Sequence, residues 1–182
     1  ALLVPSVSHA AQTRSTAPGS FLVFSVLAYG ASGTGRVSDT KSIQAAVDAC
    51  AAAKGGVVYF PPGTYFAGTI FLKSNVTLVL DRGAVLLGSP NLSDYPSVQP
   101  KLRSYSDEYV HQSLLYGEDL DGVAITGLGV IDGQGASFKD RKYRIRPYLL
   151  RLVNCTNVDV SGIHLKDSPM WVQHYLGCSD VH

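Results

Sequence analysis

The feature that most constrains this fold is a five-residue pattern that occurs twice. Asn-Cys-Thr-Asn-Val at residues 154–158 recurs as Gly-Cys-Ser-Asp-Val at residues 177–181, so Cys155 and Cys178 stand 23 residues apart. A period in the low twenties with one strand-like apolar patch per copy is typical of a β-solenoid, in which short strands of successive coils stack on one another. The chain ends at His182, inside the second copy, and we expect the stack of coils to be cut off there.

The same repeat extends towards the N-terminus at longer spacings. Val123 corresponds to Val158 at an offset of 35 residues, and Val76 corresponds to Val123 at an offset of 47. We assign the extra length to two insertions, a basic one at residues 138–146 and a polar one at residues 89–112. Insertions that keep the phase of the core form loops on one side of a solenoid, often along the binding face.

Short apolar runs between turn residues predict the strands. Each run has three to five residues, which is shorter than a typical sandwich strand and suits a β-helix in which three sheets meet at bends. Residues 24–29 alternate loosely like a further short strand, and residues 30–35 are predicted to be a glycine-rich loop. The clearest runs are residues 57–60, 69–72, 76–80 and 84–87.

A single helix is predicted over residues 39–53. Ser38 or Asp39 can cap it, because a short oxygen side chain satisfies free N–H groups of the first turn. Gly55 and Gly56 end it. An amphipathic helix would cover the apolar side chains and strand edges that the first coil otherwise leaves open to water. The predicted apolar stripe consists of Ile43, Ala46, Val47 and Cys50.

Composition excludes several classes of protein. Hydrophobic residues make up 46% of the chain and charged residues 16%, which suits a folded core and not a disordered chain. The net charge of +1 does not indicate the basic surface that nucleic-acid binding requires. No apolar run reaches the roughly 18 residues that a membrane helix needs. We therefore expect no nucleic-acid partner and no membrane partner.

The cysteines are expected to be structural thiols. The chain has three, an odd number, and their spacing matches no zinc pattern. In a solenoid of this period Cys155 and Cys178 occupy equivalent places on adjacent coils. We favour stacked buried thiols there over a disulfide. The acidic residues form no cluster of the kind that a calcium site needs, so neither a metal nor a cofactor is expected.

The N-terminus predicts export. Residues 1–10 resemble the end of a signal peptide, since an apolar stretch leads to the small residues Ser8 and Ala10, with cleavage after Ala10. The alternative is an ordinary flexible N-terminus. Residues 1–20 are thus assigned to a signal remnant and linker, and residues 21–182 to one domain of a secreted or periplasmic protein.

Several segments, taken in order, carry a resemblance to a known family. Together they resemble the N-terminal part of the glycoside hydrolase family that contains the polygalacturonases, and the resemblance covers residues 21–182. The segments are Phe24 to Ala31, the helix, Val58 to Tyr65, Leu72 to Leu78, Gly83 to Ser89, Gly127 to Gly135, and Ser168 to His174.

The resemblance implies a right-handed parallel β-helix that hydrolyses α-1,4-galacturonosyl linkages with inversion. Such hydrolysis needs one carboxyl group as acid and another as base, set apart to admit a water molecule. The family supplies them from Asn-x-Asp-Gly and Asp-Asp motifs, followed by Gly-His-Gly and Arg-x-Lys. The first three are absent from residues 1–182, and Arg144-Ile145-Arg146 lies upstream of the place expected for the last. No catalytic residue is assigned, and we expect this chain alone to be inactive.

Trp171 and His174 are the candidate substrate-binding residues. One coil period places them beside the strand on which the resemblance expects the first catalytic motif, and stacked strands lie about 4.8 Å apart. Tryptophan offers a flat apolar face to a pyranose ring, and histidine can hydrogen-bond its hydroxyl groups. Alternatively, Trp171 fills the core or a turn and His174 only orders the wall.

Charged residues elsewhere are given structural roles. The basic loop containing Arg141, Lys142, Arg144 and Arg146 could attract an acidic polyuronate, but a solvated loop is favoured. A catalytic role is not assigned to the aspartates of turns and strands, since turns favour Asp for structural reasons. These are Asp132, Asp159, Asp167 and Asp180.

The predicted function is that of part of a secreted pectic glycoside hydrolase, acting on an acidic pectic polysaccharide and monomeric when complete. Two alternatives stay open. One is a non-catalytic β-helix that binds carbohydrate, of the tailspike or adhesin type. The other is a β-helix lyase or epimerase.

Overall fold

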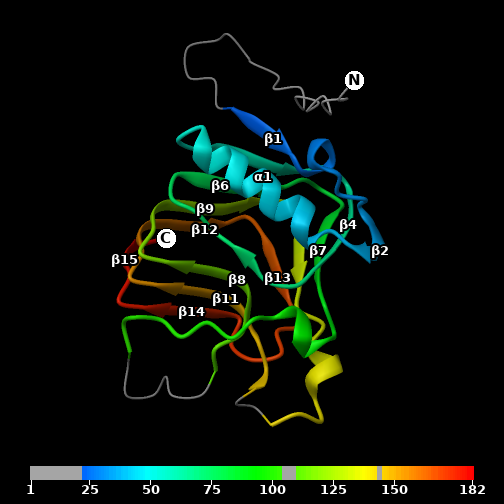
Figure 1. Cartoon of the computed structure of the whole chain (residues 1–182), viewed down its shortest axis with the longest axis vertical. Helices are drawn as coiled ribbons and strands as arrows, with labels where there is room; N and C mark the ends of the chain where they lie inside the picture. Colours follow the sequence, from blue (N-terminus) through cyan, green and yellow to red (C-terminus); the bar gives the residue numbers. More distant parts are fainter. Residues whose placement is uncertain (1–21, 104–109, 143–144) are drawn as a thin grey trace, which may run out of the picture.

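Three parallel sheets form the body of the protein (Figure 1). The computed structural model describes residues 22–103, 110–142 and 145–182. The predicted signal remnant and linker, residues 1–20, lie outside the described residues. Six strands form sheet A, five form sheet B and four form sheet C, and each coil from β3 to β14 contributes one strand to every sheet. The prediction of an all-β parallel β-helix is confirmed.

Sheet A contains the repeat. Val158 pairs with Val181 and with Val123, while Thr77 pairs with Ala124. The offsets of 23, 35 and 47 residues predicted from the sequence are therefore the register of this sheet. Its strands, in spatial order, are β1 (Val23–Ser25), β3 (Gly56–Phe60), β6 (Val76–Leu80), β9 (Asp121–Gly127), β12 (Thr156–Ser161) and β15 (Ser179–Val181).

Sheet B includes several strands that the sequence did not predict. Thr34 and Gly35, assigned to a loop, belong to the first of them. The single strand predicted over residues 24–29 is right only for residues 24 and 25, which belong to β1. A 3-10 turn, η1 (Val26–Tyr29), follows β1 and ends at Gly30 with φ 90°. This turn redirects the chain from sheet A to sheet B. The strands of sheet B are β2 (Thr34–Ser38), β4 (Gly63–Ala67), β7 (Ala84–Gly88), β10 (Val130–Asp132) and β13 (His164–Lys166).

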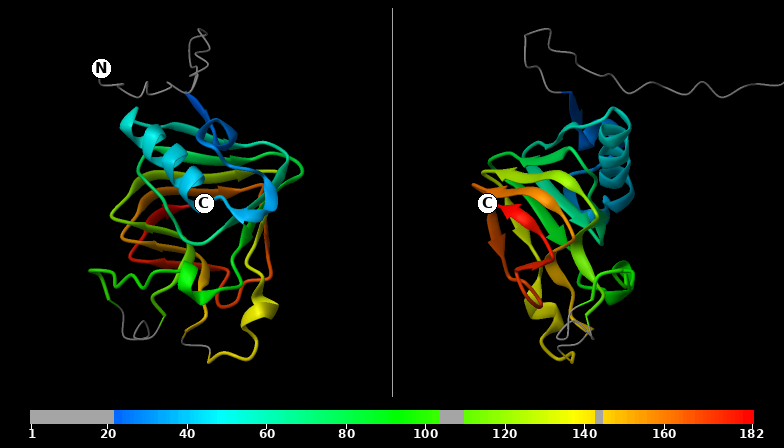
Figure 2. Two further views of the ribbon diagram at one scale, coloured as in Figure 1. Left: turned by 45° about the vertical axis from the view of Figure 1, so that its right-hand side comes forward. Right: turned by 90° about the vertical axis from the view of Figure 1, so that its left-hand side faces the viewer.

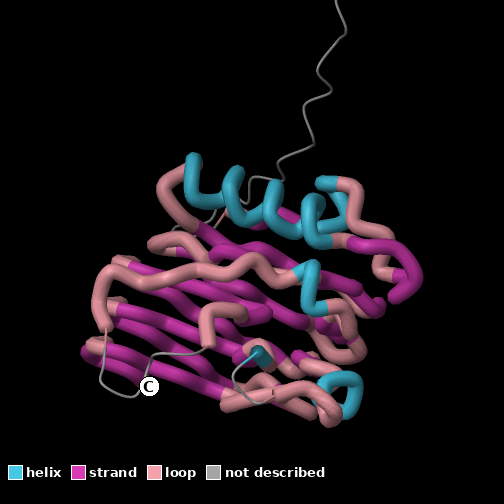
Figure 3. Tube along the Cα trace, turned by 60° about the horizontal axis from the view of Figure 1, so that its bottom comes forward, coloured by secondary structure: helices cyan, strands magenta, loops and turns pink. Residues whose placement is uncertain are grey.

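The connections that lead from sheet B into sheet C vary most in length. Residues 89–112 and 133–147 both connect sheet B to sheet C, so both insertions emerge on the same side of the coils, as predicted (Figure 1, Figure 3). Each carries a short 3-10 turn, η2 (Leu92–Asp94) and η3 (Gly135–Phe138). The strands of sheet C are β5 (Ile70–Phe71), β8 (Ser113–Glu118), β11 (Tyr148–Val153) and β14 (Gln173–Leu176).

The helix α1 (Thr40–Ala52) lies across the N-terminal end of the coils (Figure 2). Its predicted stripe is confirmed, and all four of its residues are fully buried. The expected cap is wrong, since Asp39 makes no capping bond. Its carboxylate instead accepts from the backbone N–H of Ser32 at 2.6 Å and of Gly33 at 3.3 Å, which ties the loop before β2 to the start of the helix.

All three cysteines are free thiols. Cys50 and Cys155 are buried, as expected, whereas Cys178 is only partly buried. Among the residues that the structure describes, no helix is long and apolar enough to span a membrane.

Candidate functional site

Three aromatic rings cluster at the beginning of sheet C. Trp171 lies just before β14, His174 lies within it, and Tyr148 is the first residue of β11. The ring centroids of Tyr148 and His174 are 4.9 Å apart and those of Trp171 and His174 are 5.4 Å apart, both pairs stacked. Trp171 is 48% exposed, while Tyr148 is buried. The structure thus brings together the two predicted site residues, and adds a tyrosine that sequence reasoning missed.

A buried arginine supports this cluster. Arg151 is fully buried and is in register with His174 on one side and Tyr116 on the other. Its guanidinium carbon lies 5.1 Å from the centroid of the Tyr148 ring. Its Nη1 donates to the backbone carbonyl of Val110, at the end of the insertion 89–112. The sequence contains some signal for Arg151, because a charged residue within the apolar run 148–153 needs buried partners.

The insertion 89–112 is also fixed at a second point. The backbone N–H of Lys101 donates to Glu118 Oε1 at 2.7 Å, and Tyr116 Oη donates to Glu118 Oε2 at 2.9 Å. Burial, followed by the bond to Glu118, raises the pKa of the Tyr116 hydroxyl well above its usual value. Tyr116 is therefore a neutral donor at physiological pH, and its carboxylate partner holds the loop against β8.

The turn that presents Trp171 is also held by backbone contacts. Ser168 Oγ donates to the carbonyl of Trp171 at 3.0 Å, and the N–H of Leu149 donates to the same carbonyl at 3.2 Å. A Cβ atom at Gly133 would lie 2.8 Å from Cδ of Pro169, so only glycine fits there without a shift. The position of the half-exposed indole is thus set by its neighbours on two coils.

The basic loop differs from a simple solvated one. Arg146 directs its guanidinium to its own loop, donating to the carbonyls of Lys139 and Arg141, so it is not presented to a ligand. Arg141 and Lys142 are exposed. Arg144 lies outside the described residues.

Three of the four aspartates named from the sequence lie in turn conformations or ion pairs. Asp132 accepts from the backbone N–H of Gln134 at 2.9 Å and pairs with Lys166 at 3.0 Å. Asp167 pairs with the same lysine at 3.2 Å, and Asp180 adopts a left-handed turn conformation with φ 51°. Asp159 is an exposed residue of β12. Within residues 22–103, 110–142 and 145–182, no group of three His, Cys, Asp or Glu side chains could hold a metal ion.

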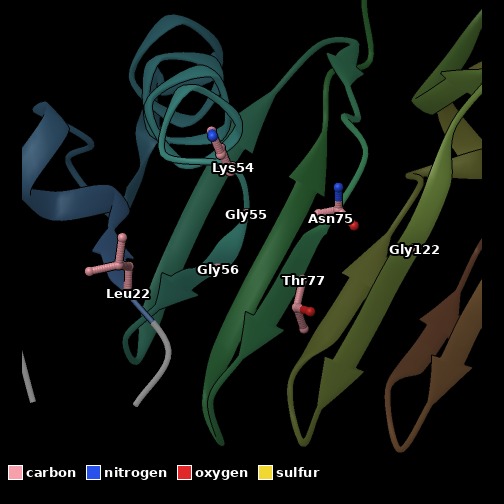
Figure 4. A pocket seen from close by; sticks show the side chains of 7 residues that line it. All are labelled: Leu22, Lys54, Gly55, Gly56, Asn75, Thr77 and Gly122. Carbon is pink, nitrogen blue, oxygen red and sulfur yellow. The ribbon is translucent and has the colours of Figure 1, made fainter. Parts of the chain in front are cut away.

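A separate hollow lies over sheet A (Figure 4). Three of its seven lining residues are glycines, and its only charged side chain belongs to Lys54. It offers neither an acid nor a base, and it is not close in the fold to the aromatic cluster, which lies on sheet C. We do not assign the functional site to it. Its lining residues are Leu22, Lys54, Gly55, Gly56, Asn75, Thr77 and Gly122.

Two family models match the chain. Residues 91–182 match the model described as Glycosyl hydrolases family 28. Residues 23–116 match the model described as Rhamnogalacturonase A/epimerase, pectate lyase-like. The family 28 match includes the aromatic cluster of Tyr148, Trp171 and His174, and it includes Arg151. It also includes both insertions, except for residues 89 and 90.

Individual relatives agree with this result. The chain is 37% identical to a probable polygalacturonase of Vitis vinifera, covering 82% of this chain and 33% of the relative. It is 36% identical to an exo-poly-alpha-D-galacturonosidase of Dickeya chrysanthemi, covering 80% of this chain and 25% of the relative. The structure of a Yersinia enterocolitica family 28 exopolygalacturonase superposes with a TM-score of 0.75 at 27% identity, covering 87% of this chain and 37% of that one. The chain thus spans a third or less of the length of the two curated relatives from Vitis vinifera and Dickeya chrysanthemi.

Proposed function

The chain belongs to glycosyl hydrolases family 28, and from that membership we propose that it binds pectic polysaccharide and forms part of an enzyme that hydrolyses galacturonosyl linkages. The observation that carries this proposal is the half-exposed Trp171 ring, stacked on His174 beside two insertions on sheet C. Binding sites for small molecules combine apolar or aromatic surface with a few well-placed polar groups. The polygalacturonase relatives support a uronic acid polymer as the ligand.

Trp171 and His174 have different roles in this proposal. The exposed face of the indole packs against a pyranose ring, because large rigid aromatic surfaces supply contact area at low entropic cost. His174 hydrogen-bonds sugar hydroxyl groups from the neighbouring position. Tyr148, which is buried against both rings, positions them and does not itself contact the sugar.

Hydrolysis requires more than this cluster. An inverting glycosidase needs two carboxyl groups that flank the scissile bond. Asp132, Asp167 and Asp180 are engaged in turns or ion pairs, and Asp159 lies on sheet A, whereas the aromatic cluster lies on sheet C. We therefore propose that residues 1–182 alone bind the polymer without cleaving it. We also propose that the protein is exported, on the composition of residues 1–10.

Trp171 provides the test, since it is the only tryptophan of the chain. Titration with oligogalacturonate should change its fluorescence, and His174→Ala should weaken binding about 5- to 10-fold, the value of one hydrogen bond of about 1 kcal/mol. His164→Ala, on sheet B, is the matched control and should bind normally.

Two assays complete the test. Reducing-end release from polygalacturonate by residues 1–182 would contradict the proposed inactivity, and an unsaturated product would indicate a lyase. Absence of binding by both fluorescence and calorimetry would refute the assignment of the subsite.

A further inference from the structure

Positive charge is concentrated in one insertion. Residues 133–147, here called the basic insertion, contain five Lys or Arg residues and one Asp, a net charge of +4. The whole chain has a net charge of +1, so the remaining residues together carry −3. Such an asymmetry produces a local positive potential that attracts anionic ligands.

Internal contacts hold together the described residues of the basic insertion. Arg146 Nε donates to the carbonyl of Arg141 at 3.0 Å, and its Nη2 donates to the carbonyls of Lys139 and Arg141, each at 2.8 Å. Phe138 is fully buried and packs edge-on against Tyr95, with centroids 6.2 Å apart. Arg146 thus holds the segment 139–141 next to the start of β11. The buried Phe138 ring fixes the beginning of the same segment.

The insertion also borders the aromatic cluster at both of its ends. At its start, the N–H of Gly135 donates to the carbonyl of Asp167 at 2.7 Å, on the turn that leads to Trp171. At its end, Arg146 precedes Tyr148 by two residues. The carbonyls of Lys139 and Arg141 are therefore held by a residue that is two positions before Tyr148 of the cluster.

Three cations of this loop are available to a ligand. The side chains of Lys139, Arg141 and Lys142 are exposed, and none of them forms an ion pair with another residue in the part of the chain that the structure describes. Lys101 and Lys166, by contrast, are paired with aspartates at 2.8 and 3.0 Å. The loop that Arg146 closes thus presents cations that have no carboxylate partner among the described residues.

We propose that Lys139, Arg141 and Lys142 bind the carboxylates of an acidic polysaccharide whose sugar ring stacks on Trp171. The inference rests on the proposed function and adds a basis for specificity. A free uronate gains an ion pair on this loop, whereas a methyl-esterified uronate or a neutral sugar does not. Arginine and lysine both serve here, since exposed carboxylates need only a positive charge within a Debye length.

The test compares two charge-matched triple variants. In the first, Lys139, Arg141 and Lys142 are each changed to Gln. In the control, three exposed cations away from the loop, Lys41, Lys54 and Arg82, are changed to Gln, so that both proteins lose the same net charge. Trp171 fluorescence measures binding of de-esterified polygalacturonate and of a fully methyl-esterified galacturonan between low and high NaCl.

The loop variant should bind polygalacturonate about tenfold more weakly at low salt, as expected for three exposed pairs of about 0.5 kcal/mol each. Its affinity should also depend less on salt, while its affinity for the esterified polymer stays unchanged. The control should match the wild type in all three respects. A single Arg141→Gln variant should show about a third of the free-energy effect.

The outcomes separate this inference from the function on which it rests. Wild-type protein that binds neither polymer refutes the proposed function, and the role of the loop with it. Wild-type protein that binds polygalacturonate, with the loop variant and the control showing the same affinity and salt dependence, overturns the role of the loop alone.

Discussion

The guanidinium carbon of Arg151 lies 5.1 Å from the centroid of the Tyr148 ring. This contact joins a fully buried charge to the aromatic cluster, because Tyr148 in turn stacks on His174 at 4.9 Å. The same guanidinium donates to the carbonyl of Val110. One side chain therefore connects the insertion 89–112 to the rings that surround Trp171.

Replacing Arg151 with Met should loosen the cluster without leaving a cavity. The change keeps bulk but removes the bond to Val110 and the contact with Tyr148, so quenching of Trp171 fluorescence by acrylamide should rise. Unfolding stability should fall by about 1–3 kcal/mol, since the Val110 carbonyl loses a charged donor. Exposed Arg82→Met is the control for both measurements. Unchanged quenching in a folded Arg151→Met protein would show that Arg151 does not position the rings.

Two glycines with similar backbone angles should respond differently to substitution. Gly127 has φ 120°, and a Cβ there would overlap the carbonyl oxygen of Leu80 on the neighbouring coil. Gly83 has φ 83°, and its nearest contact would be Cβ of Pro62 at an ordinary 3.6 Å. We expect Gly83→Ala to cost about 1–2 kcal/mol for the left-handed conformation alone, and Gly127→Ala to cost about 4 kcal/mol or more. Urea unfolding measures both, and equal losses would contradict the role of the close approach.

The sequence repeat predicted the register of sheet A, because each copy of the repeat forms the equivalent strand on a successive coil. The valines at 123, 158 and 181 occupy one stacked column, in which Val123 and Val158 are buried and Val181 is 37% exposed. Burial in such columns favours the same residue type on each coil. The lengths of the insertions did not disturb this signal, since they leave the core at one corner.

Other parts of the fold carried no comparable signal. The strand β2 (Thr34–Ser38) is exposed along most of its length, so burial imposes no apolar alternation on it. Asp39 was expected to cap α1, but its carboxylate instead accepts a hydrogen bond from the backbone of Ser32, in the loop before β2. This contact is set by the tertiary structure and not by the local sequence.

The candidate site was predicted only in part, for a related reason. Trp171 and His174 were found through a resemblance, whereas Tyr148 and Arg151 stand 26 and 23 residues before His174 and read as members of an apolar strand. Stacking of adjacent coils brings these residues together, and no local pattern predicts which side chains then share the outer face.

The three thiols should differ in reactivity. Burial raises the pKa of both Cys50 and Cys155 to about 11, so neither supplies much thiolate at pH 8, and both are inaccessible. Cys178 is partly exposed. We expect a thiol-specific chromogenic reagent to modify one thiol rapidly in the native protein and three after unfolding. Cys178→Ser should abolish the rapid phase. A native protein that releases no thiol signal under non-reducing conditions, with only one thiol after unfolding, would indicate a disulfide.

Acid should weaken the turns between sheets C and A. Asp121 Oδ1 accepts from Thr156 Oγ1 and Asn157 Nδ2, each at 2.7 Å. The bond from Thr156, followed by that from Asn157, lowers the pKa of Asp121 in the folded protein. A lowered pKa in the folded state means that the stabilisation is complete above the unfolded pKa of about 4 and is lost as the pH falls through the folded value.

Asp121→Asn tests this pH dependence. The variant should have a lower melting temperature than wild type at pH 6, and the difference should shrink towards pH 3 as the wild-type carboxylate becomes protonated. Asp159→Asn, at an exposed position of β12, is the control and should follow wild type at both pH values. Thermal unfolding followed by circular dichroism measures all three proteins. A difference between wild type and Asp121→Asn that is constant or grows on acidification would show that the ionised carboxylate does not stabilise the turn.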